Sequence, residues 1–355
     1  MLTTTLALAA LLSTPGPSTP LPAPAGSPPA REPVRVVATL PVYASLAKEI
    51  GGAEVTVVSI ADPGEDAHFV RPKPSFALEL KRADLFITTG LDLELWVPTL
   101  LDKAGNPNVL EGGRGYVSAH TGITLLDVPS AADRAAGDVH IYGNPHLHTD
   151  PLRALQVARN ITTGLTRVAP DRRGVWEGNL ASFEGRLIRR LFGERLVDAL
   201  GGPTLERLAL SGGLTQFLGT QQYQGRPLGE LLGGWLKQAE PLRGERILCY
   251  HKSWAYFEER FGLRCADYVE AKPGIPPTPR HVAELVELMQ GGVKVLLAET
   301  YFDRSKVEAV AARGGATPVI VATQTGARPA VDDYFGLVDN WIGSLNHAIG
   351  AVHHP

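Results

Sequence analysis

The chain has 355 residues, of which 44% are hydrophobic, and it carries a formal net charge of −3 at pH 7. A chain of this length and composition suits a globular protein of about two domains with sizeable cores. The charge is close to balanced and no basic stripe interleaved with aromatic residues is present. These features exclude nucleic acid as an expected ligand.

The N-terminal segment is predicted to be a leader. The chain's only long apolar run, LTTTLALAALLS at residues 2–13, is too short to span a bilayer and is followed by a proline-rich stretch that ends at Pro33. It has the length of the apolar core of a secretory signal, although no Lys or Arg precedes it. We therefore expect export by an N-terminal signal to the periplasm or another extracytoplasmic compartment.

Beyond Pro33, short apolar runs alternate with helical patterns. The first half has predicted strands over 34–40, 55–61 and 84–90, with helices over 42–52 and 74–83. The same alternation returns in the last third, with strands over 245–250, 263–270, 293–299 and 317–323 and a final helix over 334–349. This order is typical of parallel sheets covered by helices on both faces.

Two long amphipathic stretches, interrupted by Pro170, separate these regions. The predicted fold class is therefore α/β, with two Rossmann-like lobes joined by a helix. We divide the chain into a leader and linker (1–33), an N-terminal lobe (34–170), a connecting helix (171–200), an insertion of unassigned structure (201–240) and a C-terminal lobe (241–355).

The two cysteines, Cys249 and Cys265, leave two interpretations open. If the strands over 245–250 and 263–270 are neighbours, the two sulfurs come within disulfide range in an oxidising compartment. The alternative is a pair of separate buried thiols.

Three histidines occupy predicted strand-to-helix junctions. His68 lies in the loop DPGEDAHFVRPKP, His146 in GNPHLHTDP, and His251 directly after ERILCY. Ligands of open α/β sheets bind beyond the carboxyl ends of the strands, so we expect these side chains to meet in one cleft. Three imidazoles with one oxygen or water make a tetrahedral Zn²⁺ site, whereas Mn²⁺ favours more carboxylate oxygens.

Four stretches carry a resemblance to a known family. They are DAHFVRPKPS, GNPHLHTDP, CYHKSWAYFEERFGL with the following YVEAKPGIPPTPRHVAEL, and LLAETYFDRSKVEAVAARGGA. Together they make the chain similar to the zinc and manganese substrate-binding proteins of bacterial ABC transporters. The resemblance implies two lobes joined by one long rigid helix after Pro170, with metal between the lobes. It also implies His68, His146 and His251 as ligands, a membrane permease as partner, a metallochaperone as a further partner, and a monomer that is not an enzyme.

The sequence departs from the family pattern at the fourth ligand. Many relatives have an aspartate in a turn after the last strand, where this chain has Thr323 in TQTG. The candidates that remain are Glu299, Asp332, Asp333 and water, and we favour Glu299. The long His-rich loop of some zinc members is also missing, and only His140 and His148 remain near the site. For His148 three interpretations stay open: it lines the entrance of the site, it binds a second metal weakly, or it does neither. Asp150 is expected to cap the following helix.

Two other functions fit parts of this pattern. A zinc-dependent hydrolase also uses three histidines and an open position, with Glu299 or Asp66 as a general base. No HExxH, GxSxG or GxxxxGK[ST] motif supports it. A binding protein of the same architecture for a metal chelate or vitamin would need an aromatic cage, and the five tryptophans are scattered.

Overall fold

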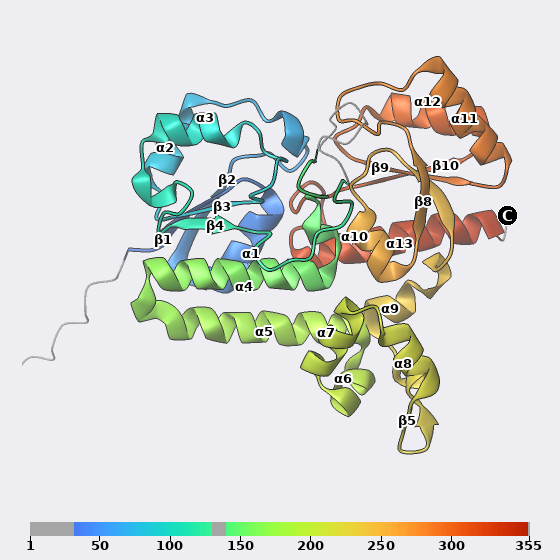
Figure 1. Ribbon diagram of the computed structural model, residues 1–355, viewed down its shortest axis with the longest axis horizontal. Coiled ribbons are helices and arrows are strands. Elements are labelled where there is room, and N and C mark those ends of the chain that lie inside the picture. Colours follow the sequence, from blue (N-terminus) through green and yellow to red (C-terminus); the bar gives the residue numbers. More distant parts are fainter. Residues whose placement is uncertain (1–31, 130–139, 354–355) are drawn as a thin grey trace, which may run out of the picture. The chain divides into compact units, whose positions relative to one another are not determined.

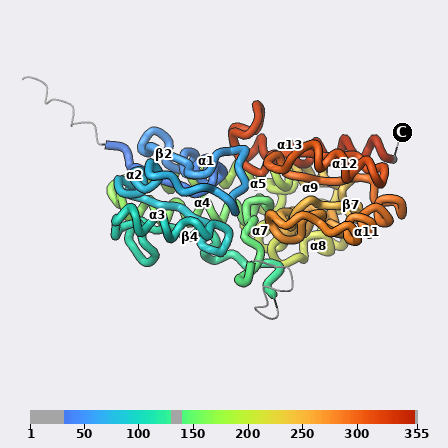
Figure 2. The backbone as a smooth tube through the Cα atoms, turned by 90° about the horizontal axis from the view of Figure 1, so that it is seen from above, coloured from blue at the N-terminus to red at the C-terminus, as the bar shows by residue number. Residues whose placement is uncertain are grey.

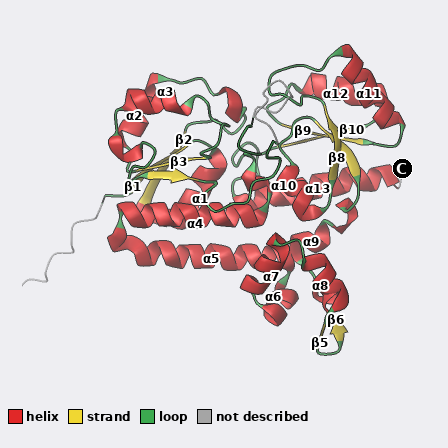
Figure 3. Cartoon of the chain, in the orientation of Figure 1, coloured by secondary structure: helices red, strands yellow, loops and turns green. Residues whose placement is uncertain are grey.

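The computed structural model describes residues 32–129 and 140–353, so the predicted signal run lies outside the described residues (Figure 1). Residues from Pro33 onward form one structural unit. Two four-stranded parallel sheets organise it, and Figure 3 shows both sheets with their flanking helices. The predicted α/β class with two mainly parallel sheets is confirmed. Within the described residues, no helix has both the length and the apolarity needed to cross a bilayer.

The first sheet has the strand order β2-β1-β3-β4, and all its neighbours are parallel. Its strands are β1 (Val34–Ala38), β2 (Val55–Ser59), β3 (Leu85–Thr88) and β4 (Tyr116–Ser118). Every residue of β3 is buried, as expected for an inner strand with helices on both faces.

Helices α1 (Pro41–Gly51), α2 (Pro74–Arg82) and α3 (Val97–Ala104) complete this lobe. α1 buries Leu46, Ala47 and Ile50 and packs on β2 and on the long helix α5 (Arg173–Phe192). α1 ends at Gly51, and the next residue, Gly52, has a φ of 55° that suits glycine. Because each helix follows or precedes a parallel strand, the loops at the carboxyl ends of the strands collect at one edge of the sheet.

The second sheet has the strand order β10-β9-β7-β8 and is also entirely parallel. Its strands are β7 (Arg246–Cys249), β8 (Arg264–Tyr268), β9 (Val295–Glu299) and β10 (Thr317–Val321). The helices of this lobe are α10 (Ala255–Phe261), α11 (Pro279–Gln290), α12 (Arg304–Gly314) and α13 (Tyr334–His353). Figure 2 shows α13, in red, alongside this lobe, where it packs on β10.

Two long helices stand between the sheets in the sequence. α4 (Pro151–Val168) and α5 (Arg173–Phe192) lie side by side, separated at Pro170 as predicted (Figure 1). α5 packs on α1 of the first lobe, and its Arg190 forms an ion pair with Asp339 of α13 in the second lobe, so it connects the lobes.

The connecting stretch 171–200 holds α5 and, after a break at Gly193, the short helix α6 (Glu194–Leu200). The segment 201–240, left unassigned by the sequence, is mostly helical and contains α7 (Gly202–Leu210), α8 (Leu214–Thr220) and α9 (Gly234–Gln238). A short antiparallel pair, β5 (Gln222–Tyr223) with β6 (Arg226–Pro227), projects beyond α8 (Figure 3). Cys249 and Cys265 form a disulfide between β7 and β8, which decides between the two interpretations of the cysteines.

Candidate metal centre

His68 lies in a short 3-10 turn beyond the carboxyl end of β2. Asp66 caps this turn, because its Oδ1 accepts a hydrogen bond from the backbone N–H of His68 at 3.0 Å. The same oxygen lies 2.6 Å from Nδ1 of the His68 ring. One carboxylate therefore sets both the backbone and the ring orientation, with Nε2 directed away from Asp66.

His140 enters the site from the loop between β4 and α4. Its Nδ1 lies 3.0 Å from Oδ1 of Asp92, and Oδ2 of Asp92 accepts the backbone N–H of Ile141 at 3.1 Å. Asp92 follows β3, so a strand end of the first sheet orients this ring through its carboxylate. His140 is buried.

His146 is held by a loop that needs its glycine and asparagine. Gly143 has a φ of 118°, and a Cβ there would lie 2.9 Å from Cβ of Leu125, which leaves no room for a side chain. Asn144 Oδ1 accepts the backbone N–H of His146 at 3.0 Å, while its Nδ2 donates to the carbonyl of Lys252 at 2.8 Å. The loop is therefore fastened to the segment just after His251.

Asp150 anchors the other end of this loop. It caps α4, as predicted, by accepting the N–H of Leu152 at 3.0 Å. Its buried carboxylate also accepts two hydrogen bonds from Arg260 of α10, at 2.8 and 2.9 Å, and one from Arg153 at 2.6 Å. Burial alone would raise the pKa of Asp150, but the charge and hydrogen bonds of Arg260, supported by Arg153, lower it.

His251 follows β7 directly in the second lobe. Its Nδ1 lies 2.9 Å from the backbone carbonyl oxygen of Glu270, which follows β8. The ring is 2% exposed, and no atom of the described residues forms a hydrogen bond with its buried Nε2. The Nε2 of His146 is likewise buried without a hydrogen-bond partner among the described residues.

The structure brings the three predicted histidines together and adds a fourth. His68, His140, His146 and His251 each offer one ligand atom, and all four atoms lie within 4.8 Å of one another. In a tetrahedral zinc site with Zn–N bonds of about 2.0–2.1 Å, the nitrogens stand about 3.4 Å apart. The Nε2 atoms of His68 and His140 are already 3.2 Å apart. A small inward movement of the other rings is enough to close the shell.

The hydrogen-bond partners imply the tautomers of these rings. When neutral, His68 and His140 donate Nδ1–H to Asp66 and Asp92, since carboxylates only accept, and Nε2 then carries a lone pair. Two such lone pairs facing each other at 3.2 Å repel unless a cation or a proton lies between them. This arrangement, together with the unpartnered Nε2 atoms of His146 and His251 among the described residues, fits a bound divalent metal.

Burial keeps two of the four imidazoles neutral. It lowers the pKa of His251 to about 3, with the nearby His68 adding to the effect. Burial, followed by the surrounding histidines, also lowers the pKa of His146 well below its usual value. Metal ligation requires neutral imidazole, so these two rings are in the ligating form across the neutral and mildly acidic range.

Two carboxylates balance the charge of an incoming cation. Burial tends to raise the pKa of Asp66, but the hydrogen bonds that Asp66 accepts from His68 outweigh burial and lower this pKa. The pKa of Asp92 is lowered against burial in the same way, by His140. Both therefore stay ionised at neutral pH, and their two negative charges match the two positive charges of a divalent metal. Carboxylates behind ligating histidines also fix the ring and raise its basicity.

Glu299, the predicted fourth ligand, is outside the group of four ligand atoms. It ends β9, where its side chain is fully buried, and burial raises its pKa to about 8. A carboxyl group in that state is largely protonated at neutral pH. Asp332 and Asp333, the other candidates, are exposed residues outside the group as well, and Asp333 accepts the N–H of Gly336 near the start of α13.

His148 also lies outside the group, although it is buried two residues after His146. Its Nε2 lies 3.0 Å from the backbone carbonyl oxygen of Thr323, in the turn that follows β10. The following residues of this turn bind the first lobe, because Gln324 Oε1 accepts the N–H of Val42 and Thr325 Oγ1 donates to the carbonyl of Pro41. The turn therefore connects the lobes by hydrogen bonds.

A small cavity adjoins the histidines. It has a volume of about 20 Å³ and is lined by residues of both lobes, among them Asp66, His68, His146, Tyr301 and Thr323. A single water needs roughly 10–15 Å³ measured in this way. The space therefore suits an ion or a water and is too small for a chelate or a vitamin.

His140 is the residue that sequence reasoning left without a role. Its loop has no periodicity that fixes its path, and the preceding residues 130–139 lie outside the described part of the chain. The available signal was its position six residues before His146 in the same loop. Asp92 gave no such signal, because its contact with His140 joins segments 48 residues apart.

Two parallel α/β lobes whose strand ends bring four histidines together define a two-lobed solute-binding protein with a candidate transition-metal centre. The chain belongs to the family described as zinc-uptake complex component A, periplasmic (ZnuA), whose model matches residues 36–189 and 228–348.

Relatives and solved structures agree with this assignment. The chain is 25% identical over 158 residues to the metal ABC transporter substrate-binding lipoprotein SsaB of Streptococcus sanguinis, covering 43% of this chain and 48% of SsaB. It is 22% identical over 282 residues to the zinc-binding lipoprotein AdcA of Streptococcus pneumoniae, covering 76% of this chain and 45% of AdcA. The chain thus spans about half the length of the curated relatives it matches.

Solved structures support the fold. A crystal structure of ZnuA superposes with a TM-score of 0.65 at 21% identity, covering 90% of this chain and 100% of that one. A manganese-bound periplasmic metal-binding protein from Candidatus Liberibacter asiaticus superposes with a TM-score of 0.61 at 16% identity, and the match covers 90% of this chain and 100% of that one.

Proposed function

We propose that this protein captures Zn²⁺ between its two lobes with the imidazoles of His68, His140, His146 and His251. The observation that carries the proposal is the convergence of four ring nitrogens, two of which are buried without a hydrogen-bond partner in the described residues. Buried polar atoms without partners are costly, and a metal ion satisfies all four nitrogens at once.

Zinc fits this shell better than manganese. Four neutral nitrogens complete the tetrahedron that Zn²⁺ prefers, whereas Mn²⁺ prefers hard oxygen donors and binds more weakly in the Irving–Williams order. The carboxylates of Asp66 and Asp92 are occupied with His68 and His140. We therefore expect zinc to be preferred over manganese by several orders of magnitude.

Delivery to the permease of a metal ABC transporter completes the proposed function. The basis is membership of the ZnuA family and the likeness to SsaB, which is a substrate-binding lipoprotein of such a transporter. An exported protein agrees with the N-terminal apolar run and with the disulfide, since disulfides persist in oxidising compartments.

The alternatives are less well supported by the geometry. A hydrolytic zinc keeps an open position for water, and four imidazoles would fill the tetrahedron. Glu299, one candidate general base, lies outside the group of ligand atoms, and Asp66 is bonded to His68. A chelate would need more room than the cavity of about 20 Å³ provides.

The proposal is tested by metal competition with a chromophoric chelator. His140→Ala and His146→Ala should each weaken zinc binding strongly while the protein keeps its circular dichroism spectrum. His120→Gln is the matched control, because His120 belongs to the same lobe but bonds to Ser118 and to the carbonyl of Thr89 instead. Wild-type affinity in His140→Ala would remove this residue from the shell, and failure of the wild-type protein to bind zinc would refute the function.

A further inference from the structure

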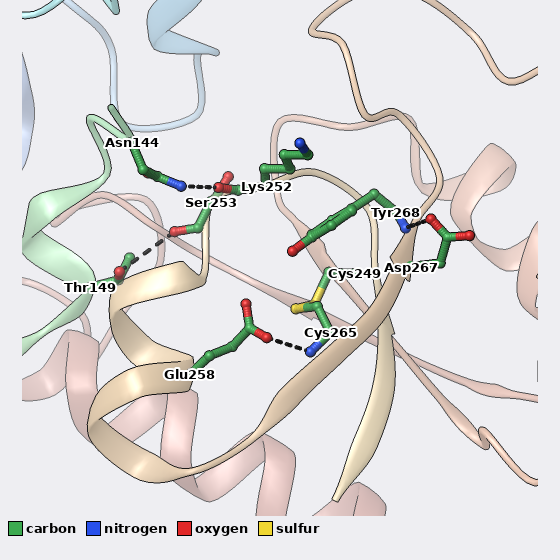
Figure 4. Close-up of a disulfide and its surroundings, with 9 residues drawn as sticks. All are labelled: Asn144, Thr149, Cys249, Lys252, Ser253, Glu258, Cys265, Asp267 and Tyr268. Carbon is green, nitrogen blue, oxygen red and sulfur yellow. Dashed lines mark hydrogen bonds between the residues drawn. A yellow bond between two sulfur atoms is a disulfide. The ribbon is translucent and has the colours of Figure 1, made fainter. Parts of the chain in front are cut away.

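The disulfide lies close to the candidate metal centre in the sequence and in space. Cys249 is the last residue of β7 and stands two residues before His251. It is fully buried, and its partner Cys265 lies in the neighbouring strand β8 (Figure 4). Glu258 of α10 accepts the backbone N–H of Cys265 at 2.6 Å, so β7, β8 and α10 are joined at this point.

The pairing of β7 with β8 is irregular beside the disulfide. Ile247 pairs with Cys265, but the next residue, Leu248, pairs with Asp267, so that Ala266 has no counterpart. One extra residue in one strand is a β-bulge, and it moves every later residue of β8 by one position relative to β7. The disulfide crosses this bulge, since it joins Cys265 before it to Cys249, which pairs with Tyr268 after it.

The shifted register determines what faces His251. Beyond the bulge, the N–H of Val269 donates to the carbonyl of Cys249 at 3.0 Å, and the N–H of Glu270 donates to the carbonyl of Tyr250 at 2.7 Å. The carbonyl of Glu270 then lies 2.9 Å from Nδ1 of His251. A register one residue different would bring level with the ring a carbonyl that points to the opposite side of the chain, and the ring would lose the acceptor that directs Nε2 into the site.

The same segment holds the loop of a second proposed ligand. The carbonyl of Lys252 accepts a hydrogen bond from Asn144 Nδ2, and the carbonyl of Ser253 accepts one from Thr149 Oγ1 at 3.5 Å (Figure 4). Asn144 in turn accepts the backbone N–H of His146. A displacement of the end of β7 would therefore reach both rings.

We propose that the Cys249–Cys265 disulfide is a positioning element of the metal centre: it fixes the bulged register of β8, which places the Glu270 carbonyl on His251. This inference rests on the proposed function, because it assigns the disulfide a part in zinc binding. Neither sulfur is a ligand, and the effect passes through the backbone of β8. Loss of an outer partner of a ligating histidine typically lowers metal affinity by about 10- to 100-fold.

The test compares the oxidised wild type with the double variant Cys249→Ala/Cys265→Ala. We expect zinc affinity, measured by chelator competition, to fall by about 10- to 100-fold in the variant at a temperature where it remains folded. In the metal-free variant, the amide hydrogens of Val269 and Glu270 should exchange faster relative to that of Leu297 in β9. The Co²⁺-loaded variant should show a changed visible absorption spectrum, because the nitrogen donors are displaced.

A control variant separates positioning from general loss of stability. Leu205→Ala removes a fully buried side chain in α7, away from both strands, and should lower the melting temperature without weakening zinc binding. In this control the amides of Val269, Glu270 and Leu297 should change together. If the double variant binds zinc as tightly as the wild type, or if Leu205→Ala weakens zinc binding equally, the proposal is overturned.

Reduction of the wild type provides a second measurement if the double variant does not fold. Tris(2-carboxyethyl)phosphine breaks the S–S bond to give two thiols and is itself oxidised to the phosphine oxide with oxygen from water. The relative amide exchange of Val269 and Glu270 should rise in the reduced, metal-free protein, and unchanged exchange would overturn the proposal. If the oxidised wild type binds no zinc, the proposed function fails, whereas the exchange data still decide whether the disulfide fixes the register.

Discussion

Acidification should weaken zinc binding far less than four ordinary histidines would allow. An imidazole with the usual pKa of about 6.5 loses about 1.5 orders of magnitude in metal affinity at pH 5, because a proton occupies the ligating nitrogen. Four such groups would cost about six orders of magnitude. Burial lowers the pKa of His251 to about 3 and that of His146 well below its usual value, so these two rings remain neutral at pH 5.

The loss between pH 7.5 and pH 5 should therefore stay well below six orders of magnitude. The assay is chelator competition at intervals of half a pH unit, corrected for protonation of the chelator. Circular dichroism at each pH shows that the protein remains folded. A loss approaching six orders of magnitude would show that all four ligands are protonated readily in the metal-free protein, and the reasoning from burial would be refuted.

Three further predictions follow from buried groups. Burial lowers the pKa of His148 to about 4, so the unfolded chain takes up a proton before the folded chain does as the pH falls below about 6.5. Between pH 8 and pH 5, the free energy of unfolding of the metal-free wild type, measured with urea, should fall by about 2 kcal/mol more than that of His148→Gln. Equal pH profiles for the two proteins would contradict this. Glu299→Gln should leave zinc affinity within about threefold of the wild type, because the carboxyl group lies outside the group of ligand atoms. A clear loss of zinc affinity in this variant would make Glu299 a ligand again. Arg260→Met should lower the free energy of unfolding by about 3 kcal/mol, since the buried carboxylate of Asp150 loses its bidentate partner; a urea midpoint equal to that of wild type would argue against this pairing.

The sequence was sufficient for the two-lobed fold because its signals are local. Apolar runs such as 34–38 and 295–299 are largely buried within parallel sheets, and the helices between them have the expected apolar periodicity. Pro170 marks the break between α4 and α5 in both sequence and structure. The helices of the segment 201–240 were not predicted, because short helices there have weak periodicity and depend on packing: α7 and α9 pack on α5, and α8 packs on α7.

The site was only partly predictable for a different physical reason. His68, His146 and His251 follow recognisable motifs, and the structure places them together, while their role as ligands remains a proposal. His140 joins them through a contact of its ring with Asp92, which no local pattern reveals. The predicted ligand Glu299 occupies a strand end and is fully buried, but it lies outside the group of four ligand atoms.

X-ray absorption at the zinc edge, on protein loaded with one equivalent of zinc, tests the proposed shell most directly. Four imidazoles predict a first shell of four nitrogen scatterers at about 2.0–2.1 Å, with the outer-ring signals of histidine. His140→Ala should lose the outer-ring signal of one imidazole, whereas His148→Gln should leave the signals of all four in place. Outer-ring signals that fit fewer than four imidazoles in the wild type, or that are unchanged in His140→Ala, would contradict the four-histidine centre.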